Sequence, residues 1–186
     1  MSNKVFYSSV AIFAFLIIAS NYTVQFPINE WLTYGALVYP VTFLLTDVLG
    51  ENYSKKEVLK VVLWGIVIAI VPTIMIADWR IALASISAFV FSQTLDVSIF
   101  HYIKQRAQKL WWLRNNVSTI ISQAFDTVIF FTVAFAFVLP AGAIVKMILG
   151  DYMVKIVMAL LDTPFFYLLA IKMKHLFRSE VTAERR

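Results

Sequence analysis

Two segments of the sequence repeat the same polar pattern. Ser92 to Phe100 and Ser122 to Phe130 match at five of nine positions, including a Gln, an Asp and a Phe at equal spacing. In a helix with 3.6 residues per turn, positions separated by three and by seven residues lie on one face. The repeat therefore predicts two helix faces that each carry an amide, a carboxylate and an aromatic ring: Gln93, Asp96 and Phe100, then Gln123, Asp126 and Phe130.

This set of side chains suits a flat heterocycle with N–H donors and a carbonyl group. A carboxylate accepts hydrogen bonds from ring N–H and amino groups, an amide both donates and accepts, and a phenyl ring stacks. The alternative is that Gln and Asp join neighbouring helices through hydrogen bonds worth about 0.6–2 kcal/mol each, with no ligand between them. The sequence leaves both interpretations open, and the repeat is a candidate binding site.

The stretches that hold this repeat are apolar enough to lie in a lipid bilayer. Hydrophobic residues make up 61% of the 186 residues and charged residues only 15%, against about 25% charged residues in soluble domains. A helix needs roughly 20 apolar residues to cross the hydrocarbon layer. The chain contains six such stretches, which predict an all-α polytopic membrane protein, one domain over residues 1–186, with transmembrane helices at 5–22, 32–49, 58–77, 81–103, 117–139 and 152–171.

The basic residues predict the orientation of the helices. Lys and Arg accumulate in cytoplasmic loops, and all but three of the 16 Lys and Arg residues fall near the two termini or within 55–60 and 104–114. We therefore expect both termini in the cytoplasm and Arg80, Lys146 and Lys155 toward the other side. The first stretch also has the features of a signal peptide, but its removal would break this charge pattern.

Acidic residues inside the spans need an explanation, because each costs roughly 2.5–3.5 kcal/mol at the middle of a membrane helix. Counted from the predicted inner helix ends, Asp96 and Asp126 both lie about 10–14 Å into the membrane, so we expect them to face one another. For Asp162 the sequence leaves open a ligand-binding role and a role beside the backbone groups that Pro164 frees.

Other positions have simpler interpretations. Asp47 and Glu51 are one turn apart, and we expect an acid pair at the membrane interface that compensates the positive charges of Lys55 and Lys56. Lys155 is expected to extend its amine toward the outer interface. Pro40 should kink the stretch 32–49. The segment 140–150 is too short to cross the membrane and is expected to form a re-entrant or surface helix.

Several functional classes are disfavoured. The chain has no Cys, its two His residues are far apart, and it contains no HExxH motif and no Gly-rich phosphate loop, so we expect no metal, no cofactor and no nucleotide hydrolysis. The basic residues flank apolar runs and form no separate domain, so we expect no nucleic-acid partner. The oligomeric state is left open, with a homo-oligomer as one alternative.

The sequence resembles the bacterial queuosine precursor transporters, also called the vitamin uptake transporter family, along essentially its whole length. One departure is Ser54, where the family usually shows Gly after the Tyr. The resemblance rests on these residues: Ser20-Asn21-Tyr22 with Gln25 and Pro27, Tyr39 to Tyr53, Gln93 to Val97, Asp126-Thr127, Asp151 to Lys155, and Pro164.

The resemblance implies a multi-pass carrier in the bacterial inner membrane that imports guanine-like precursors of the queuosine modification of tRNA. These are 7-cyano-7-deazaguanine (preQ0) and 7-aminomethyl-7-deazaguanine (preQ1). On that basis Asp96 or Asp126 would accept from the pyrimidine edge, Gln93 or Asn21 would donate to the ring carbonyl, and Phe43 or Phe100 would stack. The candidate substrate-binding set also includes Gln123 from the repeat and the motif residues Asp47 and Lys155, without assigned contacts.

Two other classes were weighed against a stand-alone carrier. A substrate-binding S component of an energy-coupling-factor importer has the same size, but its first helix typically carries small residues spaced by four, and here Ala11 is followed by Phe15. An intramembrane aspartyl enzyme also uses two facing Asp residues, but the expected Gly-x-Gly-Asp context is missing before Asp96 and Asp126. We therefore expect a transporter and not an enzyme.

Overall fold

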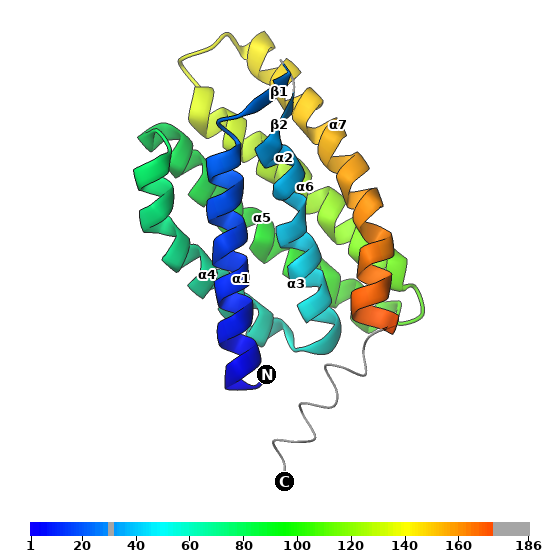
Figure 1. The fold of residues 1–186 in the computed structure, drawn as a ribbon. Helices are drawn as coiled ribbons and strands as arrows, with labels where there is room; N and C mark the ends of the chain where they lie inside the picture. The colour runs from blue at the N-terminus through cyan, green and yellow to red at the C-terminus, as the bar shows by residue number, and fades with distance from the viewer. Residues whose placement is uncertain (30–31, 173–186) are drawn as a thin grey trace.

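Long helices run side by side in the computed structural model, which describes residues 1–29 and 32–172 (Figure 1). Two short antiparallel strands, β1 (Pro27–Asn29) and β2 (Leu32–Thr33), connect the first helix to the second. The helices are α1 (Asn3–Thr23), α2 (Tyr34–Val38), α3 (Pro40–Asn52), α4 (Lys55–Ile76), α5 (Trp79–Arg106), α6 (Trp111–Phe135) and α7 (Ala141–Phe166), which continues into the π-helical segment η1 (Tyr167–Lys172).

Within the described part of the chain, five helices are long and apolar enough to cross a membrane: α1, α4, α5, α6, and α7 together with η1. The predicted span 32–49 is occupied by α2 and α3 in succession. The predicted all-α, polytopic membrane fold is confirmed. The start of α1 and the end of η1 lie at the same end of the bundle (Figure 1), as an even number of crossings requires.

The second crossing is broken at Tyr39 and Pro40. Pro40 is the first residue of α3 and carries no N–H, so it cannot donate to the carbonyl four residues earlier. The predicted kink is therefore confirmed, and it takes the form of a break between α2 and α3. As a consequence, Tyr39 lies at the junction, with its side chain buried in the bundle.

Short turns precede α4 and α5, and polar residues cap the first turn of each helix. Ser54 precedes α4 and forms a capping box with Glu57, whose Oε2 accepts from the Ser54 hydroxyl at 2.7 Å and from its N–H at 3.0 Å. Asp78 accepts from the N–H of Arg80 at 2.9 Å at the start of α5. Ser54, where the sequence departs from the family pattern, thus supports the turn and lies away from the polar residues of the repeat.

Two predicted boundaries were wrong in an informative way. Helix α6 begins at Trp111 and not at 117, and α7 begins at Ala141 and not at 152. The segment 140–150 is therefore the first part of a continuous helix, and neither a re-entrant nor a surface helix. No Pro interrupts α7 before Pro164, and Gly150 alone does not end a helix that is held by packing.

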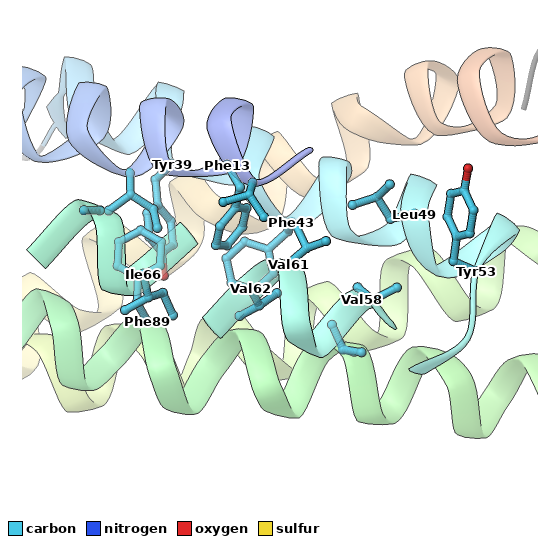
Figure 2. Packing of buried hydrophobic residues seen from close by; sticks show 14 residues of the cluster. Phe13, Tyr39, Phe43, Leu49, Tyr53, Val58, Val61, Val62, Ile66 and Phe89 are labelled. Atoms are coloured by element: carbon cyan, nitrogen blue, oxygen red, sulfur yellow. The ribbon is translucent and has the colours of Figure 1, made fainter. Parts of the chain in front are cut away.

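A hydrophobic cluster joins α1, α3, α4 and α5 on one side of the bundle (Figure 2). Phe13 and Phe43 are completely buried in it, together with Val61 and Val62. Gly65 permits this packing, because a Cβ at that position would lie 2.5 Å from Cδ1 of Phe13. The cluster fixes α3 and α5 relative to each other, and these two helices carry several of the polar residues described below.

Candidate binding site

A cavity of about 620 Å³ opens at the end of the bundle opposite the start of α1. The charge pattern predicts that this end faces away from the cytoplasm. The cavity extends as far as Asp126, which lies nine residues before the end of α6, about 14 Å along the helix. Its walls come from the end of α1, the start of α2, the end of α4, the start of α5, the outer half of α6 and the first half of α7.

A buried ion-pair network lies in this cavity. The Lys155 ammonium donates to Oδ2 of Asp126 at 3.0 Å and to Oδ2 of Asp151 at 2.8 Å. It also contacts the Thr127 hydroxyl at 3.0 Å, and that hydroxyl donates to Asp151 at 3.0 Å. Lys155 is only 6% exposed, so the expectation that its amine reaches the outer interface was wrong. One cation between two carboxylates leaves a net negative charge facing the cavity.

Two hydroxyl groups hold the carboxylate of Asp126 from the other side. Tyr39 OH and Ser92 Oγ both donate to Oδ1 of Asp126, the latter at 3.0 Å. The Lys155 ammonium lies 4.8 Å from the centre of the Tyr39 ring, within cation–π range. Asp126 therefore accepts hydrogen bonds from α3, α5 and α7 at once, which stabilises a buried charge and holds the carboxylate in one orientation.

Polar groups also line the opposite wall. Asn21, at the end of α1, accepts from the Ser85 hydroxyl at 2.7 Å and donates to the Thr73 hydroxyl at 3.2 Å. Both Asn21 and Ser85 line the cavity. These bonds fix the orientation of the Asn21 amide in a cavity that Asp126 also lines, so the amide can contact the polar edge of a bound ring.

The remaining wall is largely aromatic. Phe89, Phe130, Phe131 and Phe135 line the cavity. The rings of Phe130 and Phe131 meet edge to face at 5.3 Å. Each copy of the repeat ends in a Phe: Phe130 lines the cavity, whereas Phe100 does not.

The structure brings three of the predicted site residues to the cavity: Asn21, Asp126 and Lys155. Phe43 and Phe100 are buried in hydrophobic clusters, Phe43 between α1, α3 and α4 and Phe100 against Phe166 of α7. Both rings fill space between helices, and Phe100 also lies 5.9 Å from the Arg114 guanidinium. Stacking from either one is not available in this conformation.

Gln93 and Gln123 occupy equivalent motif positions but have different surroundings. The Gln93 amide donates to Thr42 at 2.9 Å and accepts from Thr46 at 3.3 Å, which joins α5 to α3. The amide of Gln123 has no hydrogen-bond partner among the described residues, although the side chain is completely buried. Neither residue lines the cavity.

The expectation that Asp96 and Asp126 face one another was wrong. Asp126 is bound by Ser92, whereas Asp96 lies beside Asp47 of α3 and nearer the inner end of the bundle. The error follows from the inner helix ends: α6 begins six residues earlier and α5 ends three residues later than predicted, which moves Asp126 by about 4.5 Å along the bundle relative to Asp96.

Asp47 and Glu51 also differ from their expected role as an interfacial pair. Both side chains are buried, Asp47 at 1% and Glu51 at 7% exposure. Glu51 binds Arg114 of α6 at 2.8 Å, and Asp47 accepts from Thr119 of α6 at 3.3 Å. Arg114 inside the bundle balances Glu51, so Lys55 and Lys56 are not needed there, whereas Asp47 has one hydroxyl donor and no paired cation among the described residues.

Sequence analysis missed several residues that line the cavity, above all Asp151, Tyr39 and Ser85. The signal for Asp151 was present, because it lies one helical turn before Lys155, at the i,i+4 spacing of an ion pair. Tyr39 belongs to the family motif Tyr39 to Tyr53 but was given no contact there, and Ser85 carries no local signal, since both roles depend on how the helices pack. Among the described residues no group of three or more His, Asp or Glu side chains is arranged to hold a metal ion.

Comparison with known proteins places the chain among membrane transporters. Its sequence matches the profile described as "Putative vitamin uptake transporter" over residues 33–78 and 71–169. It is 33% identical over 160 residues to "Probable queuosine precursor transporter" of Bacillus subtilis, which covers 73% of this chain and 70% of the relative. It is 30% identical over 150 residues to "Queuosine precursor transporter" of Escherichia coli, which covers 68% of this chain and 67% of the relative.

A relative from Haemophilus influenzae, also named "Probable queuosine precursor transporter", is 29% identical over 156 residues, 65% of this chain and 66% of the relative. No solved structure shows a significant match. The relatives are named as transporters and not as enzymes, which confirms the expectation of a non-enzymatic role. The profile match over more than half of the chain, together with the Bacillus relative, shows that this multi-pass membrane protein belongs to the vitamin uptake transporter family.

Proposed function

We propose that the chain imports queuosine precursors, the flat guanine-like bases preQ0 and preQ1, across the bacterial inner membrane. The observation that carries this proposal is the cavity around Asp126, with a fixed carboxylate and a Lys ammonium on one side and Phe rings on another. The names of the relatives support the same substrate class.

The polar groups of the cavity complement the edges of a guanine-like base. Such a base offers a ring N–H and an amino group on its pyrimidine edge, and these need acceptors. Oδ2 of Asp151 is occupied by Lys155 and Thr127, but Oδ1 has no hydrogen bond among the described residues. A carboxylate has about four acceptor positions, so Asp126 also retains capacity beyond its three donors. The Asn21 amide, which uses one of its two N–H groups on Thr73, then donates the other to the ring carbonyl.

The size of the cavity and its aromatic wall fit the shape of the base. Ligand cavities typically measure about 300–1,000 Å³, and this one measures about 620 Å³. Phe89 and Phe130 offer ring faces or edges against which a flat heterocycle packs. The polar groups at one wall and the rings at another select for a ring that is apolar on its faces and polar at its edge.

The test is uptake and binding of preQ0 by the wild type and by Asp126→Asn. The variant keeps the ion pair of Lys155 with Asp151, so its abundance in the membrane should stay near that of the wild type. Loss of a hydrogen bond to a charged acceptor costs about 1.5–3 kcal/mol, so binding should weaken about 10- to 150-fold. Uptake is measured in cells that cannot synthesise the precursor, and binding by calorimetry on purified protein.

Two controls accompany this test. Asp162→Asn changes a half-buried acid of α7 that does not line the cavity, and it should leave preQ0 binding within about twofold of the wild type. Purine, which lacks the amino and carbonyl groups, should not bind. If Asp126→Asn binds preQ0 as well as the wild type does, the cavity is not the binding site.

A further inference from the structure

A second polar region lies between the cavity and the inner end of the bundle. Asp47 of α3 and Asp96 of α5 are 1% and 0% exposed, and neither lines the cavity. Their carboxyl groups are neighbours close enough to interact. Two acids buried side by side in a membrane protein need compensation from a cation, from hydrogen-bond donors or from a proton.

Hydrogen-bond donors supply only part of this compensation, because the hydroxyls of Thr46, Ser118 and Thr119 lie near Asp96 without forming a hydrogen bond with it. The Thr119 hydroxyl contacts Oδ2 of Asp47 at 3.3 Å. Oδ1 of Asp47 and both carboxyl oxygens of Asp96 have no hydrogen-bond partner among the described residues. Near Thr119 on the same helix, the Ser122 hydroxyl and the Gln123 amide are also completely buried and unpartnered in this part of the structure. Unpartnered groups are thus concentrated on the facing surfaces of α3, α5 and α6.

The neighbouring cations are already engaged elsewhere. Arg114 of α6 pairs with Glu51 at 2.8 Å and donates to the Gln108 carbonyl at 3.0 Å. Lys104 of α5 donates to the carbonyls of Gly50 and Glu51, each at 2.7 Å. Arg114 therefore acts on Asp47 through space and forms no ion pair with it.

The other titratable groups around the pair do not neutralise it either. The ring nitrogens of His101 contact the carbonyls of Val97 and Tyr53. On α7, Lys155 is bound by Asp126 and Asp151, and Asp162 adds a further acid. On α1 and α4, the charged residues lie within the first turns, at the inner end of the bundle: Lys4, Lys55, Lys56, Glu57 and Lys60.

A proton is the compensation that remains. Burying an ionised carboxylate costs several kcal/mol even after relaxation, and a second one beside it adds repulsion. One proton on the pair removes one charge and gives one carboxyl an O–H that its neighbour can accept. We infer that Asp47 and Asp96 form a proton-binding site, which holds a proton while the cavity is open and releases it when the inner half of the bundle opens to water.

The site is connected to the cavity by the helices that carry it. On α5, Ser92 binds Asp126 in the cavity and Asp96 follows one turn later. On α3, Tyr39 at the junction binds the same Asp126, and Asp47 lies two turns further on. A shift of α5 against α3 that opens the inner half therefore changes both sites together. Coupling of the proton to import rests on the proposed function; the proton site itself does not.

The proton site is tested first without any substrate. Infrared difference spectra of purified protein in lipid are recorded during a pH titration, and the C=O stretch of a protonated carboxyl is followed. We expect such a band in the wild type and in Asp162→Asn, and its loss or shift in Asp96→Asn and Asp47→Asn. A band that both Asn variants retain unchanged would overturn the assignment.

Coupling is tested in proteoliposomes loaded with no substrate and supplied with preQ0, which is uncharged. One proton carried with an uncharged base moves one positive charge, so the membrane potential is held at zero with potassium and valinomycin. A gradient of one pH unit, acid outside, should then drive about tenfold accumulation by the wild type. Asp96→Asn should show no accumulation in response to the gradient, but in a second set of proteoliposomes preloaded with unlabelled preQ0 it should keep exchange with labelled preQ0. Retained exchange shows that the variant is folded.

The outcomes separate this inference from the proposed function. If the wild type exchanges preQ0 but a pH gradient drives no accumulation, or a sodium gradient drives it instead, the proton-coupling inference is wrong and the import function stands. If the wild type neither binds nor exchanges preQ0, the proposed function fails, and the infrared titration still decides whether Asp47 and Asp96 hold a proton.

Discussion

The two polar regions of the bundle handle buried charge in opposite ways. In the cavity, Asp126 has three hydrogen-bond donors and Lys155 lies between two carboxylates at 3.0 and 2.8 Å. In the inner region, Asp96 has no hydrogen-bond partner among the described residues, and no cavity reaches it. The acid of the first region has partners and lines an open cavity, whereas the acid of the second region has no hydrogen bond and lies outside that cavity.

This difference indicates which region is complete in the observed conformation. A binding site gains affinity when its polar groups are held in place before the ligand arrives. The cavity meets that condition. Unpartnered buried groups cost about 1–3 kcal/mol each, so the inner region destabilises this conformation relative to one in which water or a ligand reaches those groups. A carrier that alternates between two conformations of similar free energy needs such a balance.

The largest effect is expected where a pair is broken in the cavity. Lys155→Ala leaves Asp126 and Asp151 buried without their shared cation, and breaking a buried pair costs about 3–5 kcal/mol. We expect a large fall in membrane abundance and in thermal stability in detergent. Lys146→Ala, on the exposed face of the same helix, is the matched control and should change neither.

A second variant distinguishes loss of pairing from loss of packing. Adding Asp151→Asn to Lys155→Ala removes one of the two orphaned charges and should restore part of the lost stability. If the double variant is no more stable than Lys155→Ala, the amine contributes through its packing and not through its charge, and the contrast between the two regions is weaker than we argue.

A smaller effect is expected from the wall of the cavity. Gly35 begins α2 against the end of α1, and a Cβ there would lie 2.8 Å from the carbonyl oxygen of Ser20 and from backbone atoms of Val24. Backbone cannot yield as a side chain does, so Gly35→Ala should cost about 1–3 kcal/mol and weaken preQ0 binding by moving Asn21. The measurements are thermal stability and calorimetry. Gly142→Ala, with nothing within 4 Å, should be neutral.

How much of this could be predicted from sequence depends on the physical origin of each feature. Apolar runs predicted the crossings, because lipid imposes a minimum length on every span. Helix ends that contain charged residues were harder to predict. The residues around Arg114 were expected to form a loop, yet Arg114 pairs with Glu51 inside the bundle, and α6 starts at Trp111. With α5 ending at Arg106 and α6 beginning at Trp111, Asp126 lies further from the inner end than Asp96 does, in the cavity with Lys155.

Aromatic residues show the same limit. A Phe that stacks on a ligand and a Phe that fills a gap between helices have the same helical spacing, so the sequence could not separate Phe130, in the cavity wall, from Phe100, in the core. Only the packing of α7 against α3 and α5 decides between them. The type of site was predictable from residue chemistry, whereas its exact lining required the relative positions of the helices.

The smallest effect is also the sharpest test of the comparison, because it uses one residue type at equivalent positions of the repeat. Gln93→Leu removes hydrogen bonds with Thr42 and Thr46, so it should destabilise the protein by about 1–2 kcal/mol. Gln123→Leu removes an amide that has no partner in the described structure, so it should leave stability unchanged or raise it by about 1 kcal/mol. Thermal unfolding in the same detergent compares the two directly.

Transport separates the two variants further. If the Gln123 amide is satisfied only when the inner half opens, Gln123→Leu favours the observed conformation and should slow preQ0 uptake although the protein is at least as stable as the wild type. A Gln123→Leu variant that is destabilised as much as Gln93→Leu would mean that the amide has a partner in the resting protein. The inner region would then be paired like the cavity, and the reason to place the moving part of the carrier there would be lost.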